Sequence, residues 1–150
     1  MRRADFFYCR RFIMIKWKDD FSCNIAEIDH QHKKLFEIGG RIYYAASIND
    51  GYDHYDEIMG IVRELVEYTV YHFNYEEDLL TRHGYSEFEA HKIEHDFFIK
   101  RVKKIAGKDF ESSQYDTILE LVNFVSNWIA EHILKSDFAY KGFLNAKGIY

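Results

Sequence analysis

The sequence predicts a single all-α domain, an up-down-up-down antiparallel four-helix bundle with an N-terminal arm and a short C-terminal segment. The 150 residues contain no proline, the residue that most strongly interrupts helices. Apolar residues recur at spacings of three and four along four long stretches, which is the period of an amphipathic helix. Short turn-rich segments separate these stretches, and short connections place successive helices antiparallel.

Turn-forming residues divide the chain into its elements. The cluster at 47–51 separates the first two helices, Gly84 follows the second, and the polar segment 107–113 separates the last two. Capping boxes are expected at three helix starts: Asn24 with Glu27, Ser86 with Glu89, and Ser113 with Asp116. The helices are therefore expected near 25–46, 53–83, 87–106 and 114–135, with a tail segment near 137–145.

Residues 1–16 are expected to form an N-terminal extension and residues 17–150 the bundle domain. The extension mixes arginines with aromatics and lacks the apolar stretch of a secretory signal, and Met14 is a candidate natural start. No apolar run reaches the length of about 20 residues that spans a membrane. The net charge of −5 argues against a nucleic-acid partner. Cys9 and Cys23 have no paired spacing, so we expect reduced thiols in a cytoplasmic protein.

The inward stripes of the four helices carry the main functional signal. Each stripe is apolar except where histidine or glutamate interrupts it, and these interruptions are His32, His72, Glu76, His91, His95 and His132. A buried polar group without a partner costs a few kcal/mol, and a domain stabilised by only about 5–15 kcal/mol cannot carry six of them. These side chains must satisfy one another or bind something. Imidazoles that face each other in a bundle core are typical of metal sites.

The other three histidines are expected not to join this cluster. His30 lies about 200° around the helix from His32 and should face solvent. His54 and His83 lie about 27 Å and 16 Å along the second helix from His72, which is too far to share a site with it.

The spacing of the donors agrees with a shared site, except at its last member. The patterns HxxxE at 72–76 and HxxxH at 91–95 each place two donors one turn apart on one helix face. Asp137 follows His132 by five residues, and such positions diverge by about 140° in an α-helix. Two interpretations remain open: either the helix widens into a π-bulge or ends there and Asp137 joins the cluster, or Asp137 is a solvated surface acid.

Four segments, preceded by Trp17, carry a family resemblance: IDHQHKKLF (28–36), YHFNYEEDLL (71–80), HGYSEFEAHKIEH (83–95) and WIAEHILKSD (128–137). Together they resemble the bacterial hemerythrins, which are stand-alone helical bundles with a non-haem di-iron site. The similarity runs from about Trp17 to Leu144. The HxxxE, HxxxH and HxxxxD patterns with an upstream DxQH are specific in combination, although each alone is weak.

The resemblance implies two non-haem iron ions with an oxo or hydroxo bridge and dioxygen as their ligand. It assigns His91, His95 and His132 to one iron, His32 and His72 to the other, and Glu76 and Asp137 to both. It implies reversible dioxygen binding for storage, delivery or scavenging, without enzymatic turnover and with an unidentified protein as recipient. Five imidazoles with only two carboxylates bring little negative charge, which favours reversible binding over cleavage of the O–O bond.

The dioxygen pocket is expected to be apolar, and its candidate residues are Leu35, Phe36, Phe73, Trp128 and Ile129. Simple core packing is the competing interpretation of these five. The alternative functions are a di-iron oxidase, peroxidase or nitric-oxide-handling protein, and an oxygen or redox sensor that acts through a partner. A metal-free helical interaction module is the fourth hypothesis, and the buried histidines count against it.

Overall fold

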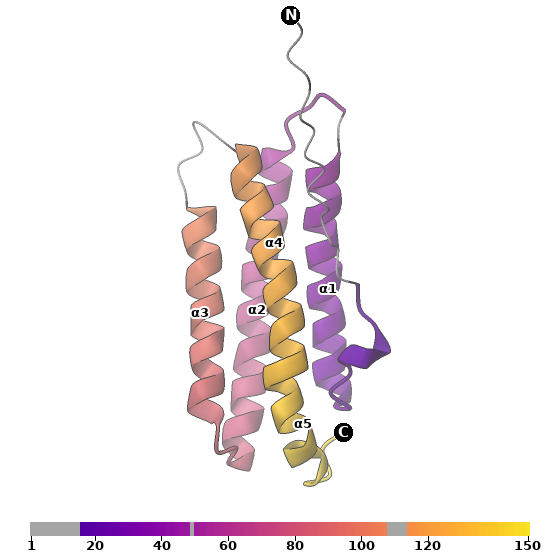
Figure 1. Cartoon of the computed structure of the whole chain (residues 1–150), viewed down its shortest axis with the longest axis vertical. Coiled ribbons are helices and arrows are strands. Elements are labelled where there is room, and N and C mark those ends of the chain that lie inside the picture. Colours follow the sequence, from indigo (N-terminus) through magenta and orange to yellow (C-terminus); the bar gives the residue numbers. More distant parts are fainter. Residues whose placement is uncertain (1–15, 49, 108–113) are drawn as a thin grey trace, which may run out of the picture.

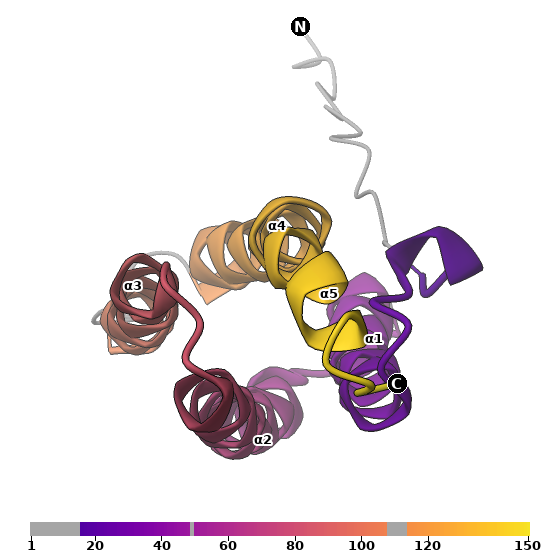
Figure 2. The ribbon, with the colours of Figure 1, turned by 90° about the horizontal axis from the view of Figure 1, so that it is seen from below.

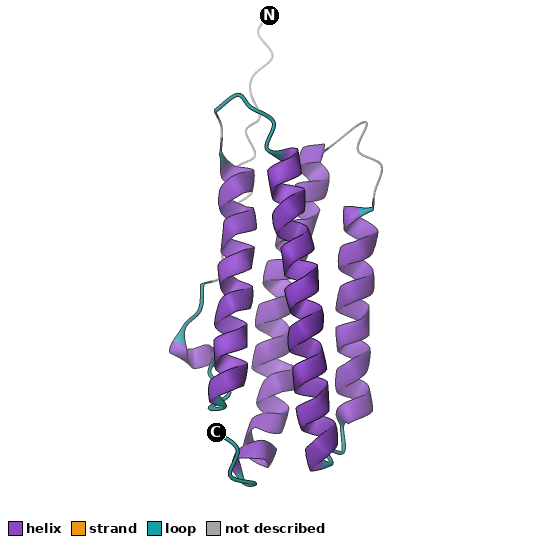
Figure 3. Cartoon of the chain, turned by 180° about the vertical axis from the view of Figure 1, so that it is seen from behind, coloured by secondary structure: helices purple, strands orange, loops and turns teal. Residues whose placement is uncertain are grey.

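The structure, a computed structural model, describes residues 16–48, 50–107 and 114–150, and it confirms the all-α fold (Figure 1). These residues form helices and turns, with no strand among them (Figure 3). The elements are η1 (Asp19–Phe21), α1 (Ala26–Ser47), α2 (Tyr55–His83), α3 (Phe88–Ala106), α4 (Gln114–His132), the π-helical turn η2 (Ile133–Asp137) and α5 (Phe138–Asn145). Met14 and all but the last residue of the expected arm lie outside the described residues.

The four long helices alternate in direction, as the short connections predict (Figure 1). Seen end-on they stand at the corners of a quadrilateral, and the packed pairs are α1–α2, α2–α3, α3–α4 and α1–α4 (Figure 2). After η2 the chain continues as α5 at the end of the bundle where α1 begins. There Lys141 Nζ donates to the carbonyl of Ser22 at 2.8 Å, which ties α5 to the segment before α1.

The predicted stripes face the core. Ile28, Leu65, Phe98 and Val125, one from each long helix, are almost completely buried. Burying a side chain of this size stabilises the fold by about 1.5–3 kcal/mol. The spacing of three residues from Glu76 predicts an inward Leu79 near the C-terminal end of α2. The structure differs there, since Leu80 is the fully buried residue and Leu79 is only partly buried. Within the described part of the chain, no helix is both long and apolar enough to cross a membrane.

Two of the three predicted capping boxes are wrong. At the start of α1 the N-cap is Ile25, and Asn24 has a left-handed backbone with φ of 54°. The carboxylate of Asp29 instead accepts a hydrogen bond from the backbone N–H of Cys23 at 2.7 Å, so it stabilises the segment that precedes α1. Ser86 lies before the N-cap of α3, and no side chain caps that helix. Ser113 of the third predicted box lies outside the described residues.

Candidate metal centre

The structure brings together all seven residues that the sequence suggested as ligands. Each is at most 5% exposed, and they come from all four long helices and η2: His32 from α1, His72 and Glu76 from α2, His91 and His95 from α3, His132 from α4, and Asp137 from η2. Four chain segments distant in sequence therefore point their donor atoms at one region of the core.

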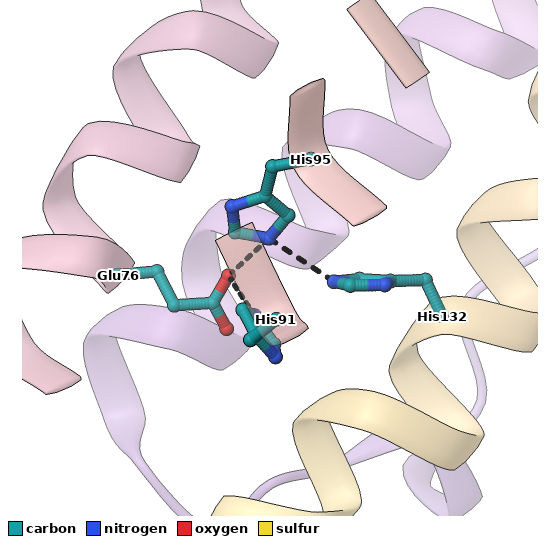
Figure 4. A group of neighbouring side chains, drawn as sticks. All are labelled: Glu76, His91, His95 and His132. Carbon is teal, nitrogen blue, oxygen red and sulfur yellow. Dashed lines mark hydrogen bonds and ion pairs between the residues drawn. The ribbon is translucent and has the colours of Figure 1, made fainter. Parts of the chain in front are cut away.

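Four of these side chains form the first group, in which two imidazoles contact one carboxylate and a third imidazole contacts one of the two (Figure 4). Glu76 Oε2 lies 3.2 Å from His95 Nε2 and 3.4 Å from His91 Nε2. His95 Nε2 lies 3.1 Å from His132 Nε2. The candidate donor atoms of the four residues lie within 4.8 Å of one another, close enough for a single metal ion to contact all of them.

A second group is built around His32 and His72, whose ring centroids lie 4.8 Å apart. These two imidazoles and Glu76 also place their donor atoms within 4.8 Å of one another. Glu76 Oε2 is 3.7 Å from His72 Nε2, so this carboxylate contacts histidines of both groups.

Asp137 joins the two groups, and the interpretation of it as a surface acid is wrong because it is completely buried. Its Oδ1 lies 3.1 Å from His132 Nε2, and its Oδ2 lies 3.1 Å from His32 Nε2. The π-helical turn Ile133–Asp137 makes this possible, since widening the helix offsets the 140° divergence of an α-helix. The conditional prediction of a π-bulge is confirmed.

The donor atoms fit a cation. Six atoms of the site are buried without a hydrogen-bond partner: both nitrogens of His32, both carboxylate oxygens of Asp137, Glu76 Oε2 and His91 Nε2. Some of them lie at ion-pair distance from each other, but they are not aligned as hydrogen bonds. Each buried polar atom left unpaired costs about 1–3 kcal/mol. Imidazole nitrogens and carboxylate oxygens are donors suited to iron. Cations bound at this centre would pair with the three carboxylate oxygens, with His91 Nε2 and with one of the two His32 nitrogens.

The outward-facing ring nitrogens of three histidines are held by a second layer that the sequence analysis missed. The three contacts are His72 Nδ1 to Gln31 Oε1 at 2.8 Å, His95 Nδ1 to Glu77 Oε1 at 2.9 Å, and His132 Nδ1 to Glu94 Oε2 at 2.8 Å. Ser136 Oγ donates to the same Glu94 oxygen at 2.5 Å, and the buried Tyr140 hydroxyl donates to Glu76 Oε1. Such partners orient metal ligands and increase their basicity.

Burial and charge shift the pKa values of the cluster in different directions. Burial lowers the pKa of His72 to about 3, so its imidazole is neutral. Burial also acts against protonation of His132, but the carboxylates of Asp137, Glu76 and Glu94 together outweigh it and raise the pKa of His132 to about 9. Burial and the charge of Glu76 oppose ionisation of Asp137, but its contacts with His132 and His32 prevail and lower its pKa to about 2. Both partners of the His132–Asp137 pair are therefore charged in the metal-free chain at neutral pH.

The structure distinguishes among the five candidate pocket residues. The Phe73 ring stacks on the His95 ring with a centroid separation of 3.6 Å, and the Trp128 ring stacks on the His132 ring with a centroid separation of 4.3 Å. Phe36 instead packs against the aromatic rings of Trp17 and Phe21, on the side of the N-terminal segment. The remaining two, Leu35 and Ile129, are buried in the core.

The three other histidines stay away from the cluster. His30 is exposed on α1. His54 is the N-cap residue of α2. Its Nε2 lies 2.9 Å from Asp50 Oδ1, and its Nδ1 lies 3.1 Å from Glu57 Oε2. His83 is the last residue of α2.

These features define an all-helical bundle protein with a buried histidine and carboxylate centre able to hold metal ions. The family model described as the Hemerythrin HHE cation binding domain matches residues 23–144. A bacteriohemerythrin of Clostridium acetobutylicum is 44% identical over 127 residues, which cover 85% of this chain and 98% of that protein. One of Pseudomonas aeruginosa is 36% identical over 124 residues, 83% of this chain and 77% of that protein. A crystal structure of wild-type hemerythrin matches with a TM-score of 0.73 and 28% identity, covering 85% of this chain and 95% of that one.

The chain belongs to the hemerythrin family. In general the members of this family bind oxygen at a non-haem di-iron centre.

Proposed function

We propose that this chain binds dioxygen reversibly at a di-iron centre formed by the seven clustered residues. His91, His95 and His132 would hold one iron, and His32 and His72 the other. Glu76 and Asp137 would be shared, because each carboxylate contacts imidazoles of both groups. This sharing is the observation that carries the proposal, since one carboxylate between two sets of imidazoles suits a pair of metal ions better than a single ion.

Two iron ions in this centre would supply reversible electron transfer to and from dioxygen. The iron on the side of His32 and His72 would have fewer histidine ligands than its neighbour, so an open coordination position is expected there. The function would be storage, delivery or scavenging of dioxygen, without enzymatic turnover.

The second layer prepares the histidines for this task. Gln31 Nε2 donates to Glu27 Oε1 at 2.8 Å, which fixes the orientation of the amide and turns its oxygen to His72. Carboxylate and amide oxygens only accept, so the Nδ1 atoms of His72, His95 and His132 must donate to them. In the neutral tautomer their Nε2 lone pairs then face the centre.

The aromatic rings would keep water from the centre. A surface hollow of about 310 Å³ is lined by Trp128 and His132, and another of about 350 Å³ by Phe73 and His95. In each hollow one of the two stacked rings therefore covers one face of the ligand histidine that lines the same hollow. We assign the apolar pocket to Leu35, Phe36, Phe73, Trp128 and Ile129 as a proposal, with Phe73 and Trp128 as its best supported members.

An anaerobic titration with ferrous iron, followed by measured oxygen uptake and release, tests this function. We expect two irons per chain, and one dioxygen per iron pair that is recovered unchanged on purging. His72→Ala should lose one iron and the oxygen uptake, whereas the exposed His30→Ala should keep both. Oxygen that is consumed and not recovered would favour the oxidase, peroxidase or nitric-oxide alternative. Binding of fewer than two irons by the unaltered chain would contradict the proposal.

The cytoplasmic location, a protein recipient of dioxygen and the domain bounds 17–150 remain predictions.

A further inference from the structure

Cys23 is a buried thiol beside the metal centre that the dioxygen function does not use. It is a free cysteine with no exposed surface. Its sulfur and donor atoms of His32 and Asp137 all lie within 4.8 Å of one another. These three residues supply one sulfur, one nitrogen and one oxygen donor at a single point of the core.

The two neighbours of Cys23 have buried donor atoms that a cation could use, and His32 Nε2 and Asp137 Oδ2 face each other at 3.1 Å. Both ring nitrogens of His32 and both carboxylate oxygens of Asp137 are buried without a hydrogen-bond partner. His32 is also the one histidine of its pair without an outer residue on Nδ1, since Gln31 serves His72. The thiol therefore faces unpaired polar atoms rather than an apolar wall.

The segment that carries Cys23 is fixed from two sides. Asp29 of α1 accepts the Cys23 backbone N–H at 2.7 Å and the Ser22 hydroxyl at 2.5 Å. Lys141 of α5 donates to the Ser22 carbonyl at 2.8 Å. The next residue, Asn24, has the left-handed φ of 54°, and its carbonyl accepts Asn145 Nδ2 at 3.1 Å. The backbone that carries the sulfur is thus held in place before any ligand arrives, which favours a preorganised donor.

Sulfur, imidazole and carboxylate are together the donors of a site for a thiophilic divalent cation. Zinc accepts cysteine sulfur at about 2.3 Å and histidine nitrogen or carboxylate oxygen at about 2.0–2.2 Å. Two donors of one tetrahedral zinc ion lie about 3.4–3.6 Å apart. The three donor atoms lie within 4.8 Å of one another, so binding requires them to approach by at most about 1.4 Å. A sulfur donor favours thiophilic cations such as zinc, whereas a site with only nitrogen and oxygen donors suits iron.

We propose that Cys23, His32 and Asp137 bind one thiophilic divalent cation, such as Zn²⁺. As the metal–sulfur bond forms, the thiol proton is released to solvent and no electron is transferred. Because His32 and Asp137 are shared with the proposed di-iron centre, zinc in this position excludes iron from the His32 side. Cys23 thereby makes the metal content, and with it dioxygen binding, sensitive to the supply of zinc relative to iron.

Cobalt and zinc titrations of the metal-free chain in a Cys9→Ser background test this site, because Cys23 is then the only thiol. Co²⁺ should give a near-ultraviolet sulfur-to-cobalt charge-transfer band. The matched Cys23→Val variant keeps an apolar side chain of similar size, and it should lack the band. The zinc affinity of Cys23→Val should be lower by at least roughly 10- to 100-fold. That is the loss caused by removing a residue that only supports a ligand, and Cys23 would be a ligand itself. Prior zinc loading should hinder iron binding more in the background protein than in Cys23→Val, which can hold zinc only through nitrogen and oxygen donors.

Absence of the band in the Cys9→Ser protein, or an equal band in Cys23→Val, would overturn the sulfur site. Equal zinc affinities of the two proteins would do the same. This inference rests on the proposed function only in sharing His32 and Asp137. Iron loading and oxygen release are measured separately in the Cys9→Ser protein, so normal values there without a cobalt band reject the sulfur site alone. A Cys9→Ser protein that folds but binds fewer than two irons points instead to failure of the di-iron proposal.

Discussion

Replacing His91 by leucine should shift the stability of the metal-free chain and of the iron-loaded chain by different amounts. In the metal-free chain, His91 Nε2 is a buried atom without a hydrogen-bond partner, and its removal should stabilise the fold by about 1–3 kcal/mol. The neighbouring carboxylates keep closer partners, because Glu76 retains the Tyr140 hydroxyl and Asp137 retains His132 at 3.1 Å.

In the iron-loaded chain the same substitution removes one metal donor. A structural metal held by four donors contributes about 10–16 kcal/mol, so one donor accounts for roughly 2.5–4 kcal/mol. The iron-induced increase in unfolding free energy should therefore be smaller by this amount in His91→Leu than in the unaltered chain.

Urea unfolding followed by circular dichroism, under anaerobic conditions with ferrous iron or with a chelator, measures both values. His30→Leu is the matched control on an exposed histidine, and it should change neither value by more than about 0.5 kcal/mol. If iron stabilised His91→Leu as much as the unaltered chain, His91 would not be a ligand. A leucine variant that gained stability in both states would favour the metal-free interaction module.

Three further predictions concern the second layer and the proton content of the centre. Glu94→Gln should weaken metal binding by about 10- to 100-fold, because His132 loses a charged acceptor. The exposed control Glu131→Gln should leave the metal affinity unchanged. Equal affinities of the two variants in a chelator competition would count against this role of Glu94. Tyr140→Phe should lower the unfolding free energy of the metal-free chain by about 1–3 kcal/mol, because Glu76 loses a buried donor, and an unchanged urea midpoint would argue against it. The pKa of His132 is raised from its usual 6.5 to about 9 in the metal-free chain, so its contribution to stability is full below pH 6.5 and disappears as the pH rises through 9. Metal binding must displace this proton, so titration calorimetry in several buffers should show proton release that declines above pH 9, and constant release across that range would contradict the assignment.

The inward stripes were predictable because burial and helix period act within one segment. His91 and His95 interrupt an otherwise apolar face of α3, so their burial follows from positions four residues apart. Asp137 needed more than periodicity. An α-helix would point it away from His132, and only the family resemblance favoured the π-helical turn that the structure contains.

The second layer could not be read from one helix at a time. Gln31, Glu77 and Glu94 each stand next to a candidate ligand in the sequence, yet each serves a histidine of another helix. Adjacent helical residues point about 100° apart, so the neighbour of an inward residue faces the adjoining helix. In the sequence these three residues lie at the edge of the polar face of each helix, which is typical of solvent-exposed residues. Only the packing of one helix against the next shows that they contact the histidines. A polar residue directly beside an inward ligand is the local signal that could have identified them.

The visible absorption spectrum of the iron-loaded chain, recorded first without oxygen, then in air, and again after oxygen is removed, tests reversible dioxygen binding most directly. We predict a charge-transfer band that appears in air and disappears when oxygen is withdrawn, through repeated cycles. A band that persists until a reductant is added would contradict reversible binding and point to an oxidase or redox sensor. No band in the presence of two bound irons would contradict dioxygen binding at this centre.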